Sequence, residues 1–367
     1  MKRVSPFKVL ILLPMLLIAM ASTGQDFRKS KEVTKAYAIK HGVELSVVNK
    51  YGRIQIIPWD KDSIKFNVLI QVRAKKEDKA EAALDGIEID FVAYQSYIES
   101  KTSYTGEGSF WDSMKSKTEM VFSGDNKTRI DYKIYVPGYV NLNLTNKYGD
   151  IFLEDHQGRV NIDLSNGDLK ARKLLEASHL KLEFAYARID EMTTGRINLD
   201  HKSELQLNKV DVLNIESRSS RIKIGLANEL IINSYRDKYE IKEVKTISFD
   251  GSYTFSEIQE LNGSSVMETK YGSVDILTIT EQARVLEFKA NQTDITFKLL
   301  PNRKLSVEAI YNEGAGLFFP KELSNKTTVK EDEEKKLVKT TGSLGPATGS
   351  PLQLKINITD GNLQVKE

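Results

Sequence analysis

The sequence contains no cysteine in 367 residues, and histidine and proline are scarce, at 4 and 8. Without cysteine the chain can form neither a disulfide nor a thiolate metal site, and it offers no cysteine for lipid attachment. The histidines are His41, His156, His179 and His201, and no two have the spacing of metal ligands. We therefore expect no metal, no other cofactor and no histidine-based catalysis.

An excess of charge is also lacking. Lysine and arginine total 53 against 51 acidic residues, which gives a formal net charge of +2, and loss of the three N-terminal cations described next would give −1. This balance offers no electrostatic basis for binding nucleic acid. The sequence also lacks a phosphate-binding glycine loop, a nucleophile elbow and the nonapeptide of calcium-binding β-rolls, so we do not expect an enzyme.

Long hydrophobic runs are absent apart from one near the N-terminus. Lys2, Arg3 and Lys8 precede an apolar run over positions 9–20, which small residues follow. This run is shorter than the roughly 20 residues that a membrane span needs, and the arrangement is typical of a secretory signal peptide. We expect residues 1–24 to be cleaved and the mature protein, without a membrane span, to lie in the periplasm, on the outer-membrane surface or outside the cell.

Small residues recur two positions before an apolar landmark along much of the chain. Between Ile151 and Ile295 the landmark spacings range from 16 to 21, with a mean of 18. A period of about 20 residues is typical of a solenoid, whose units must stack to bury their apolar faces. The sequence therefore predicts an all-β fold, a mostly parallel β-solenoid (β-helix-like) with coils of about 18 residues. The residues at this position are all small except Tyr239, and they are Gly52, Gly149, Gly167, Ala187, Ser203, Ser220, Tyr239, Ser256, Gly272, Thr293 and Gly361.

The domain organisation follows from the pattern around these repeats. Residues 25–137 form a strand-rich N-terminal segment that contains one helix over 75–84, rich in Lys, Glu and Ala, and a polar loop over 103–118. The solenoid repeats occupy 138–320. Residues 321–351 are charged and rich in Gly, Ser and Pro, which favours a linker or loop, and the strands of 352–367 are expected to close the end of the stack.

One phrase occurs three times: Asn49-Lys50-Tyr51-Gly52, Asn146-Lys147-Tyr148-Gly149 and Thr269-Lys270-Tyr271-Gly272. Together with the segments 56–60 and 130–137, it resembles the bacterial putative adhesin family, a secreted domain of unknown function built on β-solenoid repeats. The resemblance covers nearly the whole mature chain. It implies a non-enzymatic repeat protein of the cell envelope and brings no catalytic residue with it.

The glycines Gly52, Gly149, Gly167, Gly272 and Gly361 are interpreted as structural turn positions. Glycine either reaches positive φ or lets two backbones approach without a Cβ clash, and a position that recurs in nearly every coil favours this mechanical role.

Aromatic residues near the same position are candidate binding residues, namely Tyr148, Tyr186, Phe255 and Tyr271. If exposed, rings stacked on adjacent coils, such as Phe255 and Tyr271, would form a platform for sugars or a partner protein; if half-buried, they would pack a corner. Phe110 and Trp111, inside the polar loop, either anchor a partner or cover the end of the solenoid.

Charged residues one position before the landmarks suggest two further interpretations. The order Arg188, Glu204, Arg221, Glu240 alternates in sign and predicts an outward charge ladder. The acidic pairs Asp150/Asp168 and Glu240/Glu257 have the residue types needed for calcium binding or glycoside hydrolysis, but a solvated strand face explains them more simply.

The sequence thus favours a secreted, non-catalytic scaffold that binds cell-surface polysaccharide or an envelope protein through its repetitive surface. The alternative is a lyase or hydrolase acting on polysaccharide, because β-helices often carry such sites. A third hypothesis is an envelope-signalling component without a carbohydrate ligand.

Overall fold

The computed structural model describes residues 26–104, 127–334, 336–346 and 351–367. Within them the chain is almost entirely β-strand, with one helix, so the expected all-β class is confirmed. The expected signal peptide, Phe110 and Trp111 lie outside the described residues. Over the part that is described, no helix has the length and hydropathy of a membrane span.

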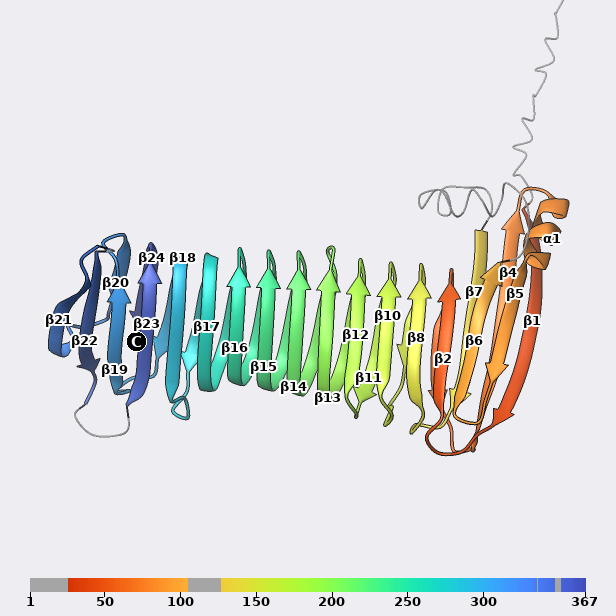
Figure 1. The fold of residues 1–367 in the computed structure, drawn as a ribbon, viewed down its shortest axis with the longest axis horizontal. Helices are drawn as coiled ribbons and strands as arrows, with labels where there is room; N and C mark the ends of the chain where they lie inside the picture. The colour runs from red at the N-terminus through yellow and green to blue at the C-terminus, as the bar shows by residue number, and fades with distance from the viewer. Residues whose placement is uncertain (1–25, 105–126, 335, 347–350) are drawn as a thin grey trace, which may run out of the picture.

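The strands lie side by side in one long row, with the helix at the N-terminal end (Figure 1). The central part of the row consists of β8 (Asn141–Lys147), β9 (Ile151–Leu153), β10 (Val160–Ser165), β11 (Asp168–Leu174), β12 (Ser178–Glu183), β13 (Tyr186–Asp200), β14 (Glu204–Arg218), β15 (Arg221–Tyr235), β16 (Lys238–Ser252), β17 (Phe255–Ile279) and β18 (Val285–Leu299).

The central strands pair in parallel at a nearly constant sequence offset. Val160 pairs with Ser178, an offset of 18, and Glu204 pairs with Arg221, an offset of 17. The offset rises to 21 between β17 and β18, where Ser264 pairs with Val285. We call each segment that pairs with the segments before and after it a rung. Adjacent rungs are about 4.8 Å apart, so residues at the same position in successive rungs form a file along the row.

Alternation of side chains explains why these residues form strands with a dry interior. In β15, Ile222, Ile224, Leu230 and Ile232 are buried, while the residues between them are mostly exposed. Because successive side chains of a strand point to opposite faces, one face of each rung joins a continuous aliphatic core. The core therefore extends along the whole row rather than forming a single central cluster.

The N-terminal end of the row does not follow the order of the sequence. One face of the sheet runs β5-β6-β2-β8 and the other runs β1-β4-β7-β3-β9. Residues 44–58 thus form the rung next to residues 141–153, and the chain between them makes the end of the row. The elements are β1 (Phe27–Ala38), β2 (Glu44–Lys50), β3 (Ile54–Pro58), β4 (Ser63–Ala74), α1 (Glu77–Asp85), β5 (Ile87–Ala93), β6 (Tyr97–Tyr104) and β7 (Lys127–Val136).

The helix expected over 75–84 is present as α1, whose Ala80 and Ala83 are buried. Acidic residues in its first turn suit the positive end of the helix dipole. The first two residues of the loop expected over 103–118, Ser103 and Tyr104, belong instead to β6 and pair with β5, and the rest of that expected loop lies outside the described residues.

The C-terminal segment corrects the prediction of a linker over 321–351. Residues 324–344 form two antiparallel strands, β21 (Ser324–Asp332) and β22 (Leu337–Leu344), and β22 also pairs with β19 (Leu305–Tyr311). Val and Thr favour these strands, although the high charge and nearly full exposure of β21 give no hydrophobic signal. A further edge element, β20 (Ala315–Phe318), pairs with β24 (Gly361–Lys366).

The closing strands are correctly expected as strands, but they do not end the stack. β23 (Leu352–Thr359) lies between β18 and β19, and β24 lies between β18 and β20. The chain therefore leaves the row after β18, builds its end with β19 to β22, and returns to fill the vacant rung.

Candidate functional site

Each rung passes one corner at which a non-glycine residue has positive φ. We call these residues the corner row. Its members are Tyr51, Tyr148, Asn166, Phe184, His201, Ser219, Arg236, Tyr253, Tyr271, Gln292 and Asp360, with φ between 46° and 65°, and Lys202 adds a second such residue beside His201. Backbone bonds link the row, as from Tyr253 N to Lys270 O at 2.8 Å. An L-residue costs roughly 1–2 kcal/mol in this conformation, so the flanking strands must hold it there.

The residue after each corner forms a small-residue column. Its members are Gly52, Gly149, Gly167, Ala185, Ser203, Ser220, Asp237, Thr254, Gly272, Thr293 and Gly361. All five glycines expected at turn positions lie in this single file. A Cβ on Gly149 would lie 1.9 Å from the carbonyl oxygen of Gly52, and one on Gly167 would lie 2.0 Å from that of Gly149. Glycine is needed here for close backbone approach, because the positive φ belongs to the preceding residue.

Three expected members of this file are wrong. The register places Ala185, Asp237 and Thr254 in it, and it places Ala187, Tyr239 and Ser256 two positions further along their strands. A shift of two positions keeps the same face of a strand, so hydrophobicity alone does not reveal the error.

The Asn of the repeated phrase ties neighbouring rungs together. Asn146 is buried, and its Nδ2 donates to the carbonyl oxygens of Gly52 at 2.8 Å and Asp150 at 3.1 Å. Asn49 is paired with Asn146 in the ladder and donates to the carbonyl of Ile130 at 3.0 Å. In the two copies that begin with Asn, this residue secures the backbone, and in all three copies Tyr occupies the corner row and Gly permits close approach.

The four candidate aromatic residues fall in two files rather than one. Tyr148 and Tyr271 belong to the corner row, whereas Tyr186 and Phe255 follow the small-residue column. The expected stack of Phe255 on Tyr271 is wrong, because Tyr271 stacks on Tyr253 with ring centroids 4.8 Å apart. Tyr148 similarly stacks on Tyr51 at 5.5 Å. Tyr148 and Tyr186 are half-buried, while Phe255 and Tyr271 are exposed.

An exposed group of aromatic and cationic side chains surrounds the second stack. The Arg236 guanidinium lies 4.9 Å from the ring centre of Tyr235 and 5.7 Å from that of Tyr253. Arg218 lies over Tyr235 at 5.9 Å, and Tyr235 contacts Tyr253 edge to face. We call Arg218, Tyr235, Arg236, Tyr253 and Tyr271 the corner cluster. Tyr253 and Tyr271 keep 45% and 44% of their surface exposed, so a ligand can reach both rings.

Behind the corner cluster lies a buried polar network. Asp237 accepts hydrogen bonds from the hydroxyls of Ser217 at 2.6 Å and Ser234 at 2.7 Å, and from the backbone N–H groups of Ser220 and Tyr235. Burial raises the pKa of Asp237 against these hydrogen bonds. Asp237 is only 3% exposed, so the network supports the corner and offers no group to a dissolved ligand.

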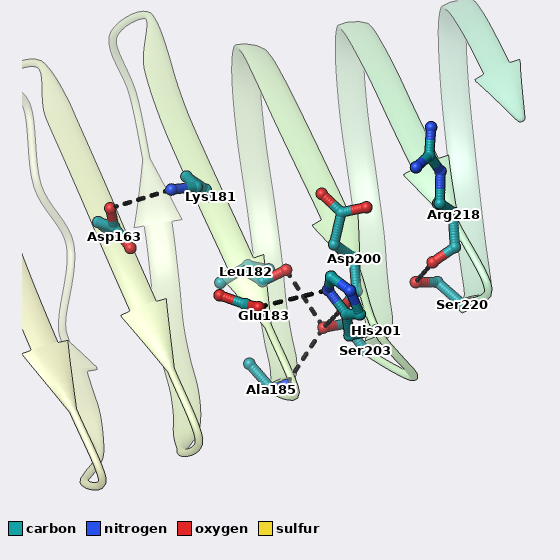
Figure 2. A network of polar contacts seen from close by, with 10 residues as sticks. All are labelled: Asp163, Lys181, Leu182, Glu183, Ala185, Asp200, His201, Ser203, Arg218 and Ser220. Atoms are coloured by element: carbon teal, nitrogen blue, oxygen red, sulfur yellow. Dashed lines mark hydrogen bonds and ion pairs between the residues drawn. The ribbon is translucent and has the colours of Figure 1, made fainter. Parts of the chain in front are cut away.

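One corner contains an extra residue, because both His201 and Lys202 have positive φ, and Ser203 occupies the small-residue column after it. Figure 2 shows Ser203 Oγ close to the backbone of two rungs, 2.7 Å from the carbonyl oxygen of Asp200 and 3.2 Å from that of Leu182. Its hydroxyl also accepts the N–H of Ala185. The same view shows His201 beside Glu183, at 3.3 Å between Nδ1 and Oε1. The Ser203 hydroxyl therefore ties the widened corner to the backbone of the preceding rung.

The two members of each acidic pair lie on adjacent rungs, but the two pairs are far apart along the row. Asp150 Oδ1 accepts the N–H of Asp168, and Glu240 is paired with Glu257 in the ladder. Four rungs separate Asp168 from Glu240, about 19 Å at the usual strand spacing. Among the described residues, no cluster of His, Asp and Glu side chains could hold a metal ion.

The expected charge ladder is present only in part. Arg221 pairs with Glu204 at 3.5 Å, but Glu240 contacts Lys223 at 2.7 Å and Lys238 at 3.2 Å instead of Arg221.

A different ladder joins Lys173, Glu191 and Lys209, with ion-pair distances of 2.9 and 3.2 Å. Hydrogen bonds from these two lysines, with their charge attraction, lower the pKa of Glu191. Opposite charges therefore face one another across these three rungs.

Solved structures similar to this chain come from Parabacteroides distasonis and Clostridium sporogenes. A putative adhesin from Parabacteroides distasonis is 12% identical, with 74% of this chain and 97% of that chain covered and a TM-score of 0.33. A putative lipid binding protein from the same organism is 9% identical, with 92% and 97% covered and a TM-score of 0.31. A putative cell adhesion protein from Clostridium sporogenes is 13% identical, with 92% and 99% covered and a TM-score of 0.22.

Adhesin names among these structures agree with the family that the repeated phrase resembles. No family model matches the sequence, and no curated protein matches it. At these identities and TM-scores the likenesses assign no ligand and no activity to this chain.

Proposed function

We propose that this chain is an exported, non-catalytic β-solenoid scaffold of the cell envelope, and that it binds polysaccharide or protein through its corner cluster. The parallel offsets of 17 and 18 support a solenoid, because they place each rung directly beside the preceding one. The continuous backbone ladder makes such a rod stiff, and a stiff rod presents its outward side chains at fixed spacing.

The observation that carries the proposal is the exposed corner cluster. Tyr253 and Tyr271 stand on adjacent rungs, supported by the Asp237 network, and Arg236 lies beside them. Tyrosine and arginine are enriched where proteins bind partners, since each combines a large contact area with hydrogen-bonding groups. The cluster therefore has the composition of a recognition surface and a support that limits the entropy lost on binding.

The same surface gives little support to the enzymatic alternative. A glycosidase needs two carboxylates that flank one sugar in a cleft. The depression that Asp150 lines does not include its partner Asp168. Asp237, whose raised pKa resembles that of a general acid, is buried behind the corner. Catalysis would require acidic or basic residues to converge in one groove, and the mixed charges spread along the row do not favour this.

Binding can be measured with the mature protein on a glycan array and in pull-downs from an envelope extract. The test variant is Tyr253→Ser with Tyr271→Ser, and the matched control is Leu226→Ser with Leu277→Ser, which removes two exposed apolar side chains elsewhere on the row. We expect at least tenfold weaker binding for the tyrosine variant and unchanged binding for the control.

Three results would contradict the proposal in different ways. Equal binding by both variants would remove the corner cluster as the binding surface. Release of sugar products at catalytic ratios would support the lyase or hydrolase. Capture of a sensor or regulator, with no binding to any glycan, would favour the envelope-signalling alternative.

A further inference from the structure

The outer face of the N-terminal sheet is rich in cations. Its strands are β1, β4, β7 and β3, and the register places the side chains of alternate residues on this face. The basic residues are Arg28, Arg53, Lys65, Arg73, Lys127, Arg129 and Lys133. Fewer acidic residues accompany them, namely Asp26, Glu32, Asp131 and Asp150.

Most of these cations have no carboxylate partner in the described part of the chain. Arg73 pairs with Asp26, and Arg129 pairs with Asp131 at 2.7 Å. The other five, Arg28, Arg53, Lys65, Lys127 and Lys133, form no ion pair among the residues that the structure describes. This separates the face from the central rungs, where cations such as Lys173 and Lys209 are matched by Glu191.

The face is hollowed at its border with the first corner-row stack. A depression of about 500 Å³ is lined by Tyr51, Arg53, Lys127, Arg129, Tyr148 and Asp150. Depressions of about 390 and 530 Å³ continue from it, the first past Lys127 and Arg129 to Arg28 and the second past Arg53 to Lys65. The path from β9 to β1 crosses four strand spacings, about 19 Å.

Arg53 is the cation of the depression that its surroundings hold most firmly. Its guanidinium lies 4.9 Å from the ring centre of Phe152, and its buried Nε has no hydrogen-bond acceptor among the described residues. Its backbone N–H donates to Asp131 Oδ1 at 2.9 Å, which fixes the start of β3. The guanidinium lines the depression and has no carboxylate partner among the described residues, so its charge remains to pair with an anionic group there.

We infer that this depression binds a sugar unit of an acidic polysaccharide, with Arg53, Lys127 and Arg129 holding its carboxylate or sulfate group and Tyr148 forming a wall. The polysaccharide continues along the two neighbouring depressions toward Arg28 and Lys65. Arginine suits this role because its planar fork pairs with carboxylate through two hydrogen bonds. This inference rests on the proposed binding function and adds to it the charge class of the ligand and a second surface.

Geometry favours a polysaccharide over other polyanions. A membrane surface is planar and is bound by projecting apolar or basic side chains, whereas these cations line hollows beside a half-buried ring. The whole chain is close to neutral, which gives no broad field of the kind that attracts nucleic acid.

The test measures binding of the mature protein to polygalacturonate and alginate oligosaccharides, with neutral dextran oligosaccharides as the uncharged probe. The variant is Arg53→Gln with Lys127→Gln, and the matched control, Lys242→Gln with Lys298→Gln, removes the same charge from exposed positions elsewhere. We expect at least tenfold weaker binding of acidic oligosaccharides by the first variant, no change in the control, and weaker binding by the wild type as salt rises. Thermal unfolding of each variant checks that it folds.

Each alternative outcome would overturn this inference, and each can be distinguished from a failure of the proposed function. Binding of acidic oligosaccharides that both variants retain removes this site. Binding of neutral glycans through Tyr253 and Tyr271 alone overturns the inference and leaves the corner cluster in place. Preference for phosphatidylglycerol vesicles or single-stranded DNA over polygalacturonate overturns the ligand class.

Discussion

Asn146 Nδ2 lies 2.8 Å from the carbonyl oxygen of Gly52, although the two residues are 94 positions apart in the sequence. The bond joins two copies of the repeated phrase on adjacent rungs and closes the gap that the N-terminal excursion creates. We expect Asn146→Ala to lower the free energy of unfolding by about 1–3 kcal/mol, because the carbonyls of Gly52 and Asp150 lose a buried donor. Asn161→Ala, which removes an exposed amide bonded to Asn143, is the control and should change stability by less than about 0.5 kcal/mol.

Close approach at the small-residue column predicts a penalty for any side chain at its glycines. Gly149→Ala places a Cβ 1.9 Å from a backbone oxygen, so the rungs must separate, and overpacking of this kind costs about 1–3 kcal/mol. Gly138→Ala meets nothing closer than 4.0 Å and serves as the control. Calorimetric melting temperatures should fall for the first and stay within error for the second. Equal melting temperatures would show that the backbones can part freely.

The corner row predicts that some glycine substitutions stabilise this protein. Ser219 is exposed and has a φ of 54°, so Ser219→Gly removes the strain of an L-residue in the left-handed region. We expect a gain of about 1 kcal/mol after the entropic cost of glycine. Ser248→Gly, at an exposed position within β16, should instead destabilise by about 0.5–1 kcal/mol. A loss of stability in both variants, measured by denaturant unfolding, would contradict strain at the corner.

His156 predicts a loss of stability in mild acid. The imidazole is buried, Nε2 lies 2.6 Å from the carbonyl oxygen of Val140, and burial lowers its pKa from the ordinary 6.5. Because the unfolded chain then binds a proton first, this contribution to stability is present above pH 6.5 and falls as the pH drops through the folded pKa. Melting temperatures between about pH 7 and 5 should fall less steeply for His156→Gln than for the wild type. His179→Gln, at an exposed histidine, should keep the wild-type slope.

The raised pKa of Asp237 predicts the opposite pH dependence of stability for this residue. Burial raises its pKa above the ordinary 3.8, so its contribution to stability is largest below pH 3.8 and is lost as the pH rises through the folded pKa. The melting temperature of Asp237→Asn relative to the wild type should therefore improve as the pH rises from about 3.5 to 7. The exposed Asp250→Asn is the comparison and should show no such trend. A constant difference for Asp237→Asn would mean that the carboxyl titrates normally.

The repeat period and the approximate position of the corner are visible in the sequence, because Gly, Ser and Thr return once per rung. The exact register is not visible. In three rungs the sequence suggests the strong hydrophobes Ile189, Ile241 and Ile258 as landmarks. The ladder instead places Ala187, Tyr239 and Ser256 at the landmark position, and both sets face the same interior. Counting forward from Gly167 in steps of 18 residues gives Ala185 and Ser203, the true members of the small-residue column. The residue before Ala185 is Phe184, which belongs to the corner row.

The corner cluster and the cationic face depend on proximity that no local pattern carries. Arg53 and Lys127 come together only because β3 pairs with β7, a pairing set by the whole N-terminal excursion. The sequence does not single out Tyr253, because the two-position error in the landmark of that rung selects Phe255 as the candidate aromatic residue instead. Strands β21 and β22 resemble a linker in sequence because pairing rather than burial stabilises them.

The return of β23 and β24 to the rung beside β18 has a consequence for biogenesis. A ribosome delivers residues 305–344 before the segment that must lie between them and β18, so this end cannot assemble one rung at a time as synthesis proceeds. Until residues 352–366 arrive, β18 and β19 each expose an unpaired edge, and such edges recruit other strands. This end of the row therefore stays open until late in synthesis, when β23 and β24 close it.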